Sequence, residues 1–171
     1  MNGDLKNSKM TNKIVMSGLM IALVFVATFL PKIPIPGGYV NLGDGMVIFA
    51  GFLFGPLTGL ISGAVGSALS DAAGGYYMWI PVTFVVKGIE GLVAGHLVRK
   101  SRDALIPVTS LLTIAIMPIG YFVGEWLLLS IIDHTLGWVS AVSNLFFNGL
   151  QAAACYVLAL VLIFGLKRFK M

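Results

Sequence analysis

The fold depends on one uncharged stretch, MVIFAGFLFGPLTGLISGAVGSAL, which covers residues 46–69. The stretch is long enough to cross a membrane once as a single helix, or to reverse at Gly55-Pro56 and form two shorter helices. The first arrangement gives the chain five membrane passes, and the second gives it six. The positions of the cationic side chains help to choose between the two arrangements.

Nine of the eleven Lys and Arg residues lie in three short stretches between apolar segments. These residues are Lys6, Lys9, Lys13, Arg99, Lys100, Arg102, Lys167, Arg168 and Lys170. Cytoplasmic loops collect cations, and six passes put all nine inside with Lys32 alone outside. Five passes put at best seven inside and three outside. The pattern therefore favours six passes, with both termini in the cytoplasm.

The composition excludes a soluble globule. A chain of 171 residues that is 58% hydrophobic and 11% charged has too little polar surface to cover one. Its net charge of +4 reflects topology and attraction to anionic headgroups, and is weak evidence for nucleic-acid binding. The first apolar run, 14–30, ends at prolines 31, 34 and 36 and is interpreted as a retained span instead of a signal peptide. Cys155 is interpreted as a small buried side chain.

We therefore expect an all-α integral membrane bundle that forms a single domain over residues 1–171. Residues 1–12 are expected to form a polar cytoplasmic N-terminus. The six expected helices cover roughly residues 13–30, 44–54, 56–72, 80–99, 104–131 and 139–167, of which the second is short.

Small residues recur at every fourth position from residue 55 to residue 67, and the row ends at Asp71. Such a row lets two helix backbones approach closely inside a membrane. Gly91 and Gly95 repeat the spacing in the fourth expected helix, and Gly18 and Ala22 repeat it in the first. We interpret the rows of the third and fourth helices as packing within the chain. The first-helix pair serves either such packing or the docking of a partner subunit.

Polar and aromatic side chains gather in the expected outer half of the bundle, on three helices and two loops. Lone amides in membrane helices usually bond neighbouring helices, and interfacial aromatics often act only as anchors. Their convergence at one depth nevertheless predicts a pocket for a small flat heteroaromatic ligand. The candidate binding residues are Tyr39, Asn41, Trp79, Thr83, Lys87, Tyr121, Glu125, Asn144, Asn148 and Gln151.

Lys87 and Glu90 lie on one face of the fourth expected helix. Unpaired charges at this depth are costly, so the face must point into protein or into a wet cavity. The two residues either form an internal ion pair or provide a ligand-binding group with its counter-charge. Both hypotheses hold together if Glu90 directs Lys87 toward a cavity.

The chain contains no Gly-x-x-x-x-Gly-Lys-Ser/Thr phosphate loop, no His-Glu-x-x-His zinc motif and no Gly-x-Ser-x-Gly nucleophile motif. His96 and His134 are too far apart in the sequence to suggest a zinc site. These patterns predict binding and translocation without catalysis, metal or cofactor.

Two segments carry a resemblance to a known family: YVNLGDGMVIFAGFLFGPLTGLISGAVGSALSD at residues 39–71 and IPVTFVVKGIEGLVAG at residues 80–95. The sequence resembles the membrane-embedded substrate-binding subunits, or S components, of energy-coupling factor (ECF) vitamin transporters. It is most similar to the riboflavin-type branch, which includes transporters for hydroxymethylpyrimidine, pyridoxine and pantothenate.

The resemblance implies six helices, cytoplasmic termini and a vitamin pocket near the outer surface beneath the loop after the first helix. It also implies that Gly18 and Ala22 occupy the positions of a two-alanine motif that docks on a transmembrane scaffold subunit. Two separate ATPase subunits would drive transport, and the S component would topple to open its pocket inward. The expected location is the bacterial cell membrane.

A hydroxymethylpyrimidine or pyridoxine type of ligand is favoured, because aromatics, amides and Glu125 suit stacking on such a ring and hydrogen bonding to it. Pantothenate is an alternative, since Lys87 could pair with its carboxylate. Riboflavin would need a larger cavity. Two other classes remain open at this stage: a self-sufficient ion-coupled secondary transporter, and a membrane enzyme or structural bundle protein.

Overall fold

The computed structural model describes residues 2–35 and 38–170, and the side chains of residues 10–35 and 38–169. Pro36, one of the prolines expected to end the first span, lies outside the described residues. The main elements, in chain order, are α1 (Asn2–Phe29), β1 (Ile33–Ile35), β2 (Gly38–Val40), α2 (Gly43–Phe54), α3 (Pro56–Gly74), α4 (Ile80–Leu97), α5 (Ile106–Ile114), α6 (Ile116–Ser130) and α7 (His134–Lys170). One-turn helices, η1 (Tyr77–Trp79) and η2 (Asp103–Leu105), precede α4 and α5.

The uncharged stretch at residues 46–69 forms two helices that meet at Gly55. This glycine has φ 92° and ψ −178°, a backbone conformation that side-chain-bearing residues avoid, so the chain reverses there. Pro56 follows at the first position of α3, where its missing N–H leaves no hydrogen bond unmade. The two-helix interpretation of this stretch is therefore confirmed.

Other helix bounds differ from those expected. α1 begins at Asn2, so the segment expected as a polar tail is helical; no proline interrupts it. The segment at 104–131 is divided into α5 and α6 at Ala115, because Pro118 has no N–H to donate to the carbonyl of Ile114. α7 begins at His134, five residues before the expected start, and the carboxylate of Asp133 accepts the Leu136 backbone N–H there.

The molecule is an all-α membrane bundle with one small hairpin. Within the described residues, four helical segments are long and apolar enough to cross a bilayer: Met10–Phe29, Tyr77–Leu97, Asp103–Ser130 and His134–Phe169. Their outer faces expose large apolar side chains, such as Leu127 at 57% and Phe146 at 72%, as expected for a lipid-facing surface. With α2 and α3 counted as the two remaining passes, the chain would cross the membrane six times. That count stays a prediction.

α3 and α4 pack through their glycines. A Cβ atom built on Gly59 would collide with the carbonyl oxygen of Gly91, and one built on Gly91 would collide with that of Gly59. Gly63 meets the Lys87 backbone and Gly95 meets Pro56 in the same way. The two small-residue rows therefore serve packing within the chain, as predicted, and they fix the side chains that lie further along the same helix faces.

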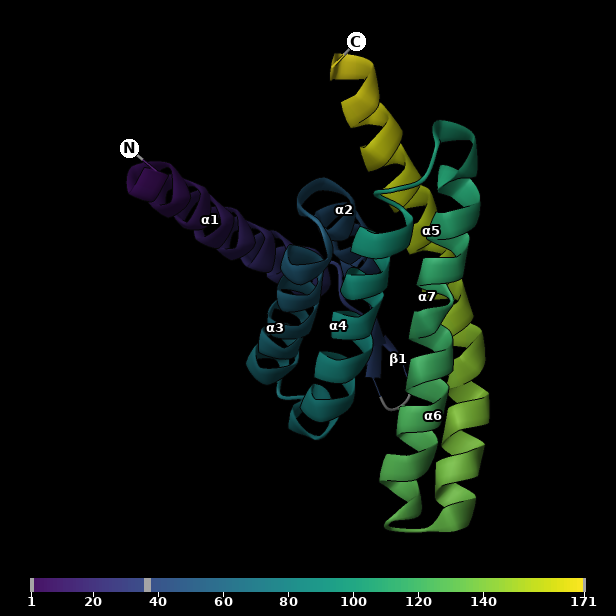
Figure 1. Cartoon of the computed structure of the whole chain (residues 1–171). Coiled ribbons are helices and arrows are strands. Elements are labelled where there is room, and N and C mark those ends of the chain that lie inside the picture. Colours follow the sequence, from purple (N-terminus) through teal and green to yellow (C-terminus); the bar gives the residue numbers. More distant parts are fainter. Residues whose placement is uncertain (1, 36–37, 171) are drawn as a thin grey trace.

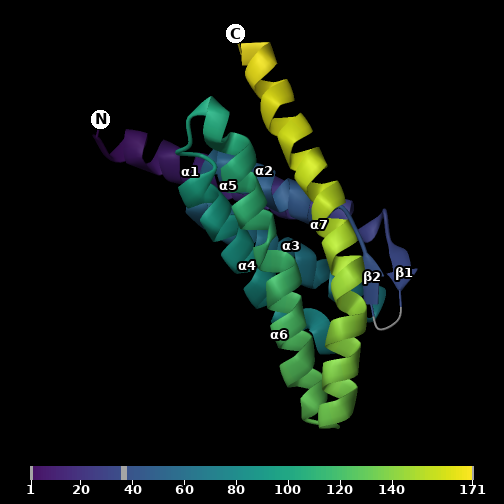
Figure 2. The same cartoon turned by 90° about the vertical axis from the view of Figure 1, so that its right-hand side faces the viewer.

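Figures 1 and 2 show the C-terminus and the α4–α5 connection at one end of the bundle, and the α3–α4 and α6–α7 connections at the other. The N-terminal half of α1 leaves the bundle sideways (Figure 1). The antiparallel hairpin pairs Ile33 with Val40 and Pro34 with Tyr39, and it lies beside α7 (Figure 2). Where a lid-like loop was expected after the first span, the chain thus forms a hairpin that packs against the last helix.

The apolar core lies where α2, α4, α5, α6 and α7 meet. Its side chains are fully or almost fully buried: Ile48, Ala94, Val98, Ile106, Ile114, Met117, Ala152, Cys155, Ala159 and Ile163. Cys155 is buried as predicted, and its thiol faces the carbonyl of Asn41 at 3.4 Å. This core holds α7 against α4 and α6, the helices that carry the candidate binding residues Thr83, Lys87, Tyr121 and Glu125.

Candidate functional site

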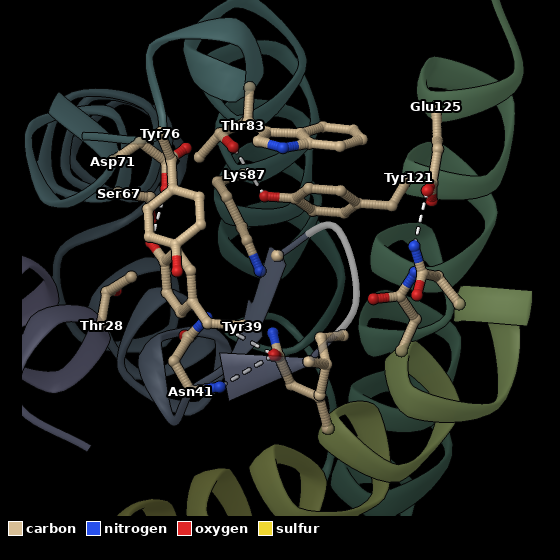
Figure 3. A pocket seen from close by; sticks show the side chains of 16 residues that line it. Thr28, Tyr39, Asn41, Ser67, Asp71, Tyr76, Thr83, Lys87, Tyr121 and Glu125 are labelled. Carbon is tan, nitrogen blue, oxygen red and sulfur yellow. Dashed lines mark hydrogen bonds between the residues drawn. The ribbon is translucent and has the colours of Figure 1, made fainter. Parts of the chain in front are cut away.

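A cavity lies between the hairpin, α3, α4, α6 and α7. All ten candidate residues line it: Tyr39, Asn41, Trp79, Thr83, Lys87, Tyr121, Glu125, Asn144, Asn148 and Gln151. Figure 3 shows Tyr39 and Tyr76 on one side of this cavity and Tyr121 on the other, with the Lys87 side chain between them. The structure thus brings the ten side chains together, and their part in ligand binding stays a prediction.

The hairpin is tied to α7 through Asn41 and Gln151. The Asn41 backbone N–H donates to the Gln151 side-chain oxygen at 2.9 Å, and the Asn41 amide lies 3.4 Å from the same oxygen. The Asn41 side-chain oxygen accepts the Gly43 N–H at 2.8 Å, where α2 begins. Asn41 therefore connects the end of the hairpin to the start of α2 and to α7, at one corner of the cavity.

Lys87 is paired with Asp44 of α2, not with Glu90. Both partners of this ion pair are buried, at 1% and 0% exposure. The second Asp44 oxygen accepts the Gln151 amide at 2.7 Å, so α7 completes the network. In the described part of the chain, both Glu90 oxygens are buried without a hydrogen-bond partner. This corrects the hypothesis of an ion pair within α4: a carboxylate from another helix balances the lysine.

Two further hydrogen-bonded pairs line the opposite wall. Thr83 on α4 and the Tyr121 hydroxyl on α6 lie 2.8 Å apart, and the Lys87 ammonium lies 5.3 Å from the centre of the Tyr121 ring (Figure 3). Glu125 accepts hydrogen bonds from Ser140 and, at 2.6 Å, from the Asn144 amide. α6 and α7 are thereby joined next to the cavity, and Glu125 is only 2% exposed.

Lys32, Tyr39 and Tyr76 form an aromatic and cationic cluster beside the hairpin. The Lys32 ammonium lies 4.3 Å from the Tyr39 ring centre and 4.4 Å from that of Phe29, and it donates to the Ser70 carbonyl at 3.1 Å. The Tyr39 and Tyr76 ring centres are 4.7 Å apart. These contacts attach the hairpin to the end of α3.

The Tyr39 hydroxyl donates to the first carboxylate oxygen of Asp71 on α3. Burial, together with the adjacent Asp71 carboxylate, raises the pKa of the Tyr39 phenol well above its ordinary value. The hydroxyl therefore keeps its proton, and remains a donor to Asp71, across the whole physiological pH range.

The structure adds six lining residues that the sequence did not single out for the site: Thr28, Ile35, Gly38, Ser67, Asp71 and Tyr76. Ser67 and Asp71 belong to the α3 row that was interpreted as packing. The row does pack at Gly59 and Gly63, but its next two members face the cavity. The signal for this change was the replacement of glycine by polar side chains along one helix face.

Gly18 and Ala22 lie on an exposed face of α1. Both residues are exposed, and a Cβ atom built on Gly18 would meet no atom within 4 Å. Within the described chain this face is therefore free of close packing, unlike the glycine rows of α3 and α4. Its role in docking stays a prediction.

The chain matches the model of a family described as ECF-type riboflavin transporter, S component, over residues 8–168. It is 31% identical over 161 residues to the thiamine precursor transporter HmpT of Lactococcus lactis subsp. cremoris, covering 92% of this chain and 89% of that protein. An uncharacterized protein of Pyrococcus woesei is 42% identical over 101 residues, which cover 57% of this chain and 68% of that protein. A UPF0397 protein of Exiguobacterium sp. is 27% identical over 163 residues, which cover 92% of this chain and 87% of that protein.

A protein of this kind is a multi-pass membrane subunit of a transporter and not an enzyme. Family membership implies association with an ECF module and uptake of a vitamin or a vitamin precursor. The matched segment contains nearly the entire bundle and every residue of the cavity. This chain therefore belongs to the ECF-type riboflavin transporter S component family.

Proposed function

We propose that this chain captures a single-ring heteroaromatic vitamin or vitamin precursor, of the hydroxymethylpyrimidine or pyridoxine type, from outside the cell. The observation that carries the proposal is one cavity in which amides, hydroxyls and carboxylates from five helices lie among Tyr39, Tyr76 and Tyr121. Aromatic faces suit stacking on a flat ring, and the polar groups suit its nitrogen and hydroxyl substituents. The similarity to a thiamine precursor transporter supports the same class.

The cavity argues against the two rival ligands. The space open to the centre of a water molecule is about 50 Å³, which favours a single ring over the three fused rings of riboflavin. Pantothenate would need a free cation for its carboxylate, but the Lys87 ammonium is already paired with Asp44. The Asp71 and Glu125 carboxylates in the lining also disfavour an anion.

In this proposal the chain works as the substrate-binding subunit of an ATP-driven importer in a bacterial cell membrane. A transmembrane scaffold subunit docks on α1 at Gly18 and Ala22, and two ATPase subunits supply the energy. The open surface of α1 at Gly18 supports such docking, because small residues let another helix approach closely. The proposed topology has six passes and cytoplasmic termini.

Mass spectrometry of the compound that copurifies with the full chain tests the substrate. We expect a stoichiometric pyrimidine or pyridine derivative; a copurifying flavin or pantothenate would overturn the substrate class.

Uptake into proteoliposomes tests the coupling. ATP-dependent uptake that requires the added scaffold and ATPase subunits is expected, whereas uptake by this chain alone, driven by an ion gradient, would instead identify a secondary transporter.

A further inference from the structure

Two of the buried polar side chains without partners lie in the lining of the cavity. Within the described residues, Ser67 Oγ and Asp71 Oδ2 have no hydrogen-bond partner. Ser67 is 0% exposed and Asp71 is 3% exposed. Buried polar groups are almost always paired, and an orphaned one costs free energy. Two such groups in one cavity lining therefore indicate that something outside the chain satisfies them.

The fold holds both groups in place. They stand one helical turn apart on α3, on the face that Gly59 and Gly63 press against α4. The other oxygen of Asp71 accepts the Tyr39 hydroxyl, and the Thr83 hydroxyl of α4, which lies 2.8 Å from the Tyr121 hydroxyl, also interacts with the Asp71 carboxylate. Figure 3 shows Ser67 and Asp71 together on one wall of the cavity, beside Tyr76.

The chemistry of the pair is specific. A serine hydroxyl can donate one hydrogen bond, whereas a carboxylate oxygen only accepts. Side by side, they offer one donor and one acceptor. The complementary ligand edge has an acceptor next to a donor, as in a ring nitrogen beside a carbon that bears an amino group.

We infer that Ser67 and Asp71 form a subsite that recognises the edge of an amino-substituted nitrogen heterocycle, with Ser67 donating to the ring nitrogen and Asp71 accepting from the amino group. This inference rests on the proposed function and narrows it, because it selects an aminopyrimidine over pyridoxine, which has no such edge. It assigns to α3 a binding role in addition to its packing role.

The test compares two probes on the purified full chain in detergent: the aminopyrimidine that carries a hydroxymethyl group, and the same compound with hydrogen in place of the amino group. Titration calorimetry gives the dissociation constants. We expect the unmodified protein to bind the amino compound about tenfold more tightly than the other, the effect of one or two hydrogen bonds to a buried polar site. Asp71→Asn should reduce this preference to about threefold or less, whereas Ser67→Ala loses the hydrogen bond to the ring nitrogen that both probes carry and should weaken the binding of both by about the same factor, roughly tenfold.

Ser110→Ala is the matched control. Within the described residues the Ser110 hydroxyl is equally buried and also without a partner, but it does not line the cavity, so this variant should bind both probes with unchanged affinity. Ser67→Ala removes a buried hydroxyl that has no partner in the ligand-free protein, so the melting temperature should stay equal or rise slightly, which separates a binding effect from misfolding.

Two results would overturn the inference while leaving the proposed function intact: equal affinity of the unmodified protein for both probes, or an undiminished preference in Asp71→Asn together with unchanged affinity of Ser67→Ala for both probes. Binding of neither probe, together with binding of pantothenate or riboflavin, would refute the proposed substrate class, and the inference with it.

Discussion

Asp44 shows how one residue can set the character of a whole cavity. A lysine at this depth in a membrane helix is costly unless it is paired, and Lys87 gains its partner from α2. Because Gln151 occupies the other oxygen of Asp44, the carboxylate is fully engaged by α4 and α7. Lys87 therefore lines the cavity as a neutralised cation, better suited to a polar neutral ring than to an anion.

Asn148 offers a direct test of the cavity. It lines the cavity from α7, and in the described structure its side chain makes no hydrogen bond to the protein. Asn148→Ala should therefore weaken binding of the copurified ligand about tenfold, through loss of one or two ligand hydrogen bonds, and leave folding unaffected. Titration calorimetry measures the change.

Ser143→Ala on the same helix, where the hydroxyl bonds only the Val139 carbonyl, is the control and should bind normally. Glu125→Ala should also weaken binding, although it strands Ser140 and Asn144 as well. Unchanged affinity in both Asn148→Ala and Glu125→Ala would refute the cavity as the binding site.

At the scale of elements, α3 and α4 contact each other directly through their backbones, at glycines that have no side chain to keep the helices apart. The α3–α4 interface brings the backbones of Gly59 and Gly91 together, so that a methyl group on either would need the helices to separate. Without a hydrophobic force between helices in lipid, this close approach is the main source of their association. The position of Ser67 and Asp71 depends on it.

Gly59→Ala should therefore destabilise the bundle by about 1–3 kcal/mol, the usual cost of overpacking. Thermal unfolding in detergent, followed by circular dichroism, measures the change. Gly149→Ala is the matched control, since a Cβ atom there meets nothing within 4 Å. It should leave stability equal or slightly higher, because alanine favours the helix. Equal melting temperatures for the two variants would contradict the packing argument.

Asp133 caps the first turn of α7, in the connection between two candidate membrane spans. Hydrogen bonds from the backbone N–H groups of Leu136 and Thr135 lower the pKa of its carboxyl group. A lowered pKa in the folded state means that the stabilisation is present at neutral pH, and is lost as the pH falls through that pKa. Asp133→Ala should thus melt below the unmodified protein at pH 7, and the difference should shrink on acidification.

Asp133→Asn keeps an oxygen that can accept the same bonds, and should retain most of the cap without the pH dependence. A melting difference between Asp133→Ala and the unmodified protein that stays constant down to low pH would contradict the charged cap.

Sequence patterns identified most of the polar residues that line the cavity, but not the residue that neutralises Lys87. The i, i+4 spacing on three apolar helices placed Thr83, Glu125 and Asn148 at a common depth, because helical periodicity is local. The partner of Lys87 could not be found in this way, because Asp44 is 43 residues distant in the sequence and stands at the start of a different expected helix. The hairpin was missed for a similar reason: its strands are three residues long and rich in proline and glycine.

At the scale of the molecule, the basic segments support the predicted topology. The C-terminus and the α4–α5 connection, which carry two of them, lie at the same end of the bundle, and the N-terminal end of α1 is inclined toward it (Figures 1 and 2). The cavity lies nearer the opposite end, where the α3–α4 connection contributes Tyr76 and Trp79. Two of the three basic segments thus lie at one end of the molecule, and the cavity, with Lys87 in its lining, lies toward the other.

The exposed face of α1 provides a test of assembly. Gly18→Trp or Ala22→Trp should leave ligand binding intact but abolish copurification with the scaffold and ATPase subunits, because the bulky ring prevents close approach of a second helix. Val161→Trp, at a lipid-facing position of α7 that is 63% exposed, is the control and should copurify normally. Full recovery of the complex with both α1 variants would show that another face docks.

The buried pair between Asp44 and Lys87 has a consequence for biogenesis. α2 leaves the ribosome carrying a carboxylate whose counter-ion lies 43 residues further along the chain. A lone carboxylate is poorly accepted by lipid, so α2 cannot settle in the bilayer until α4 has emerged and supplied the ammonium group. We therefore expect α2 and α4 to insert together, and a nascent chain arrested before residue 87 should remain with its second helix in the translocon or at the membrane surface.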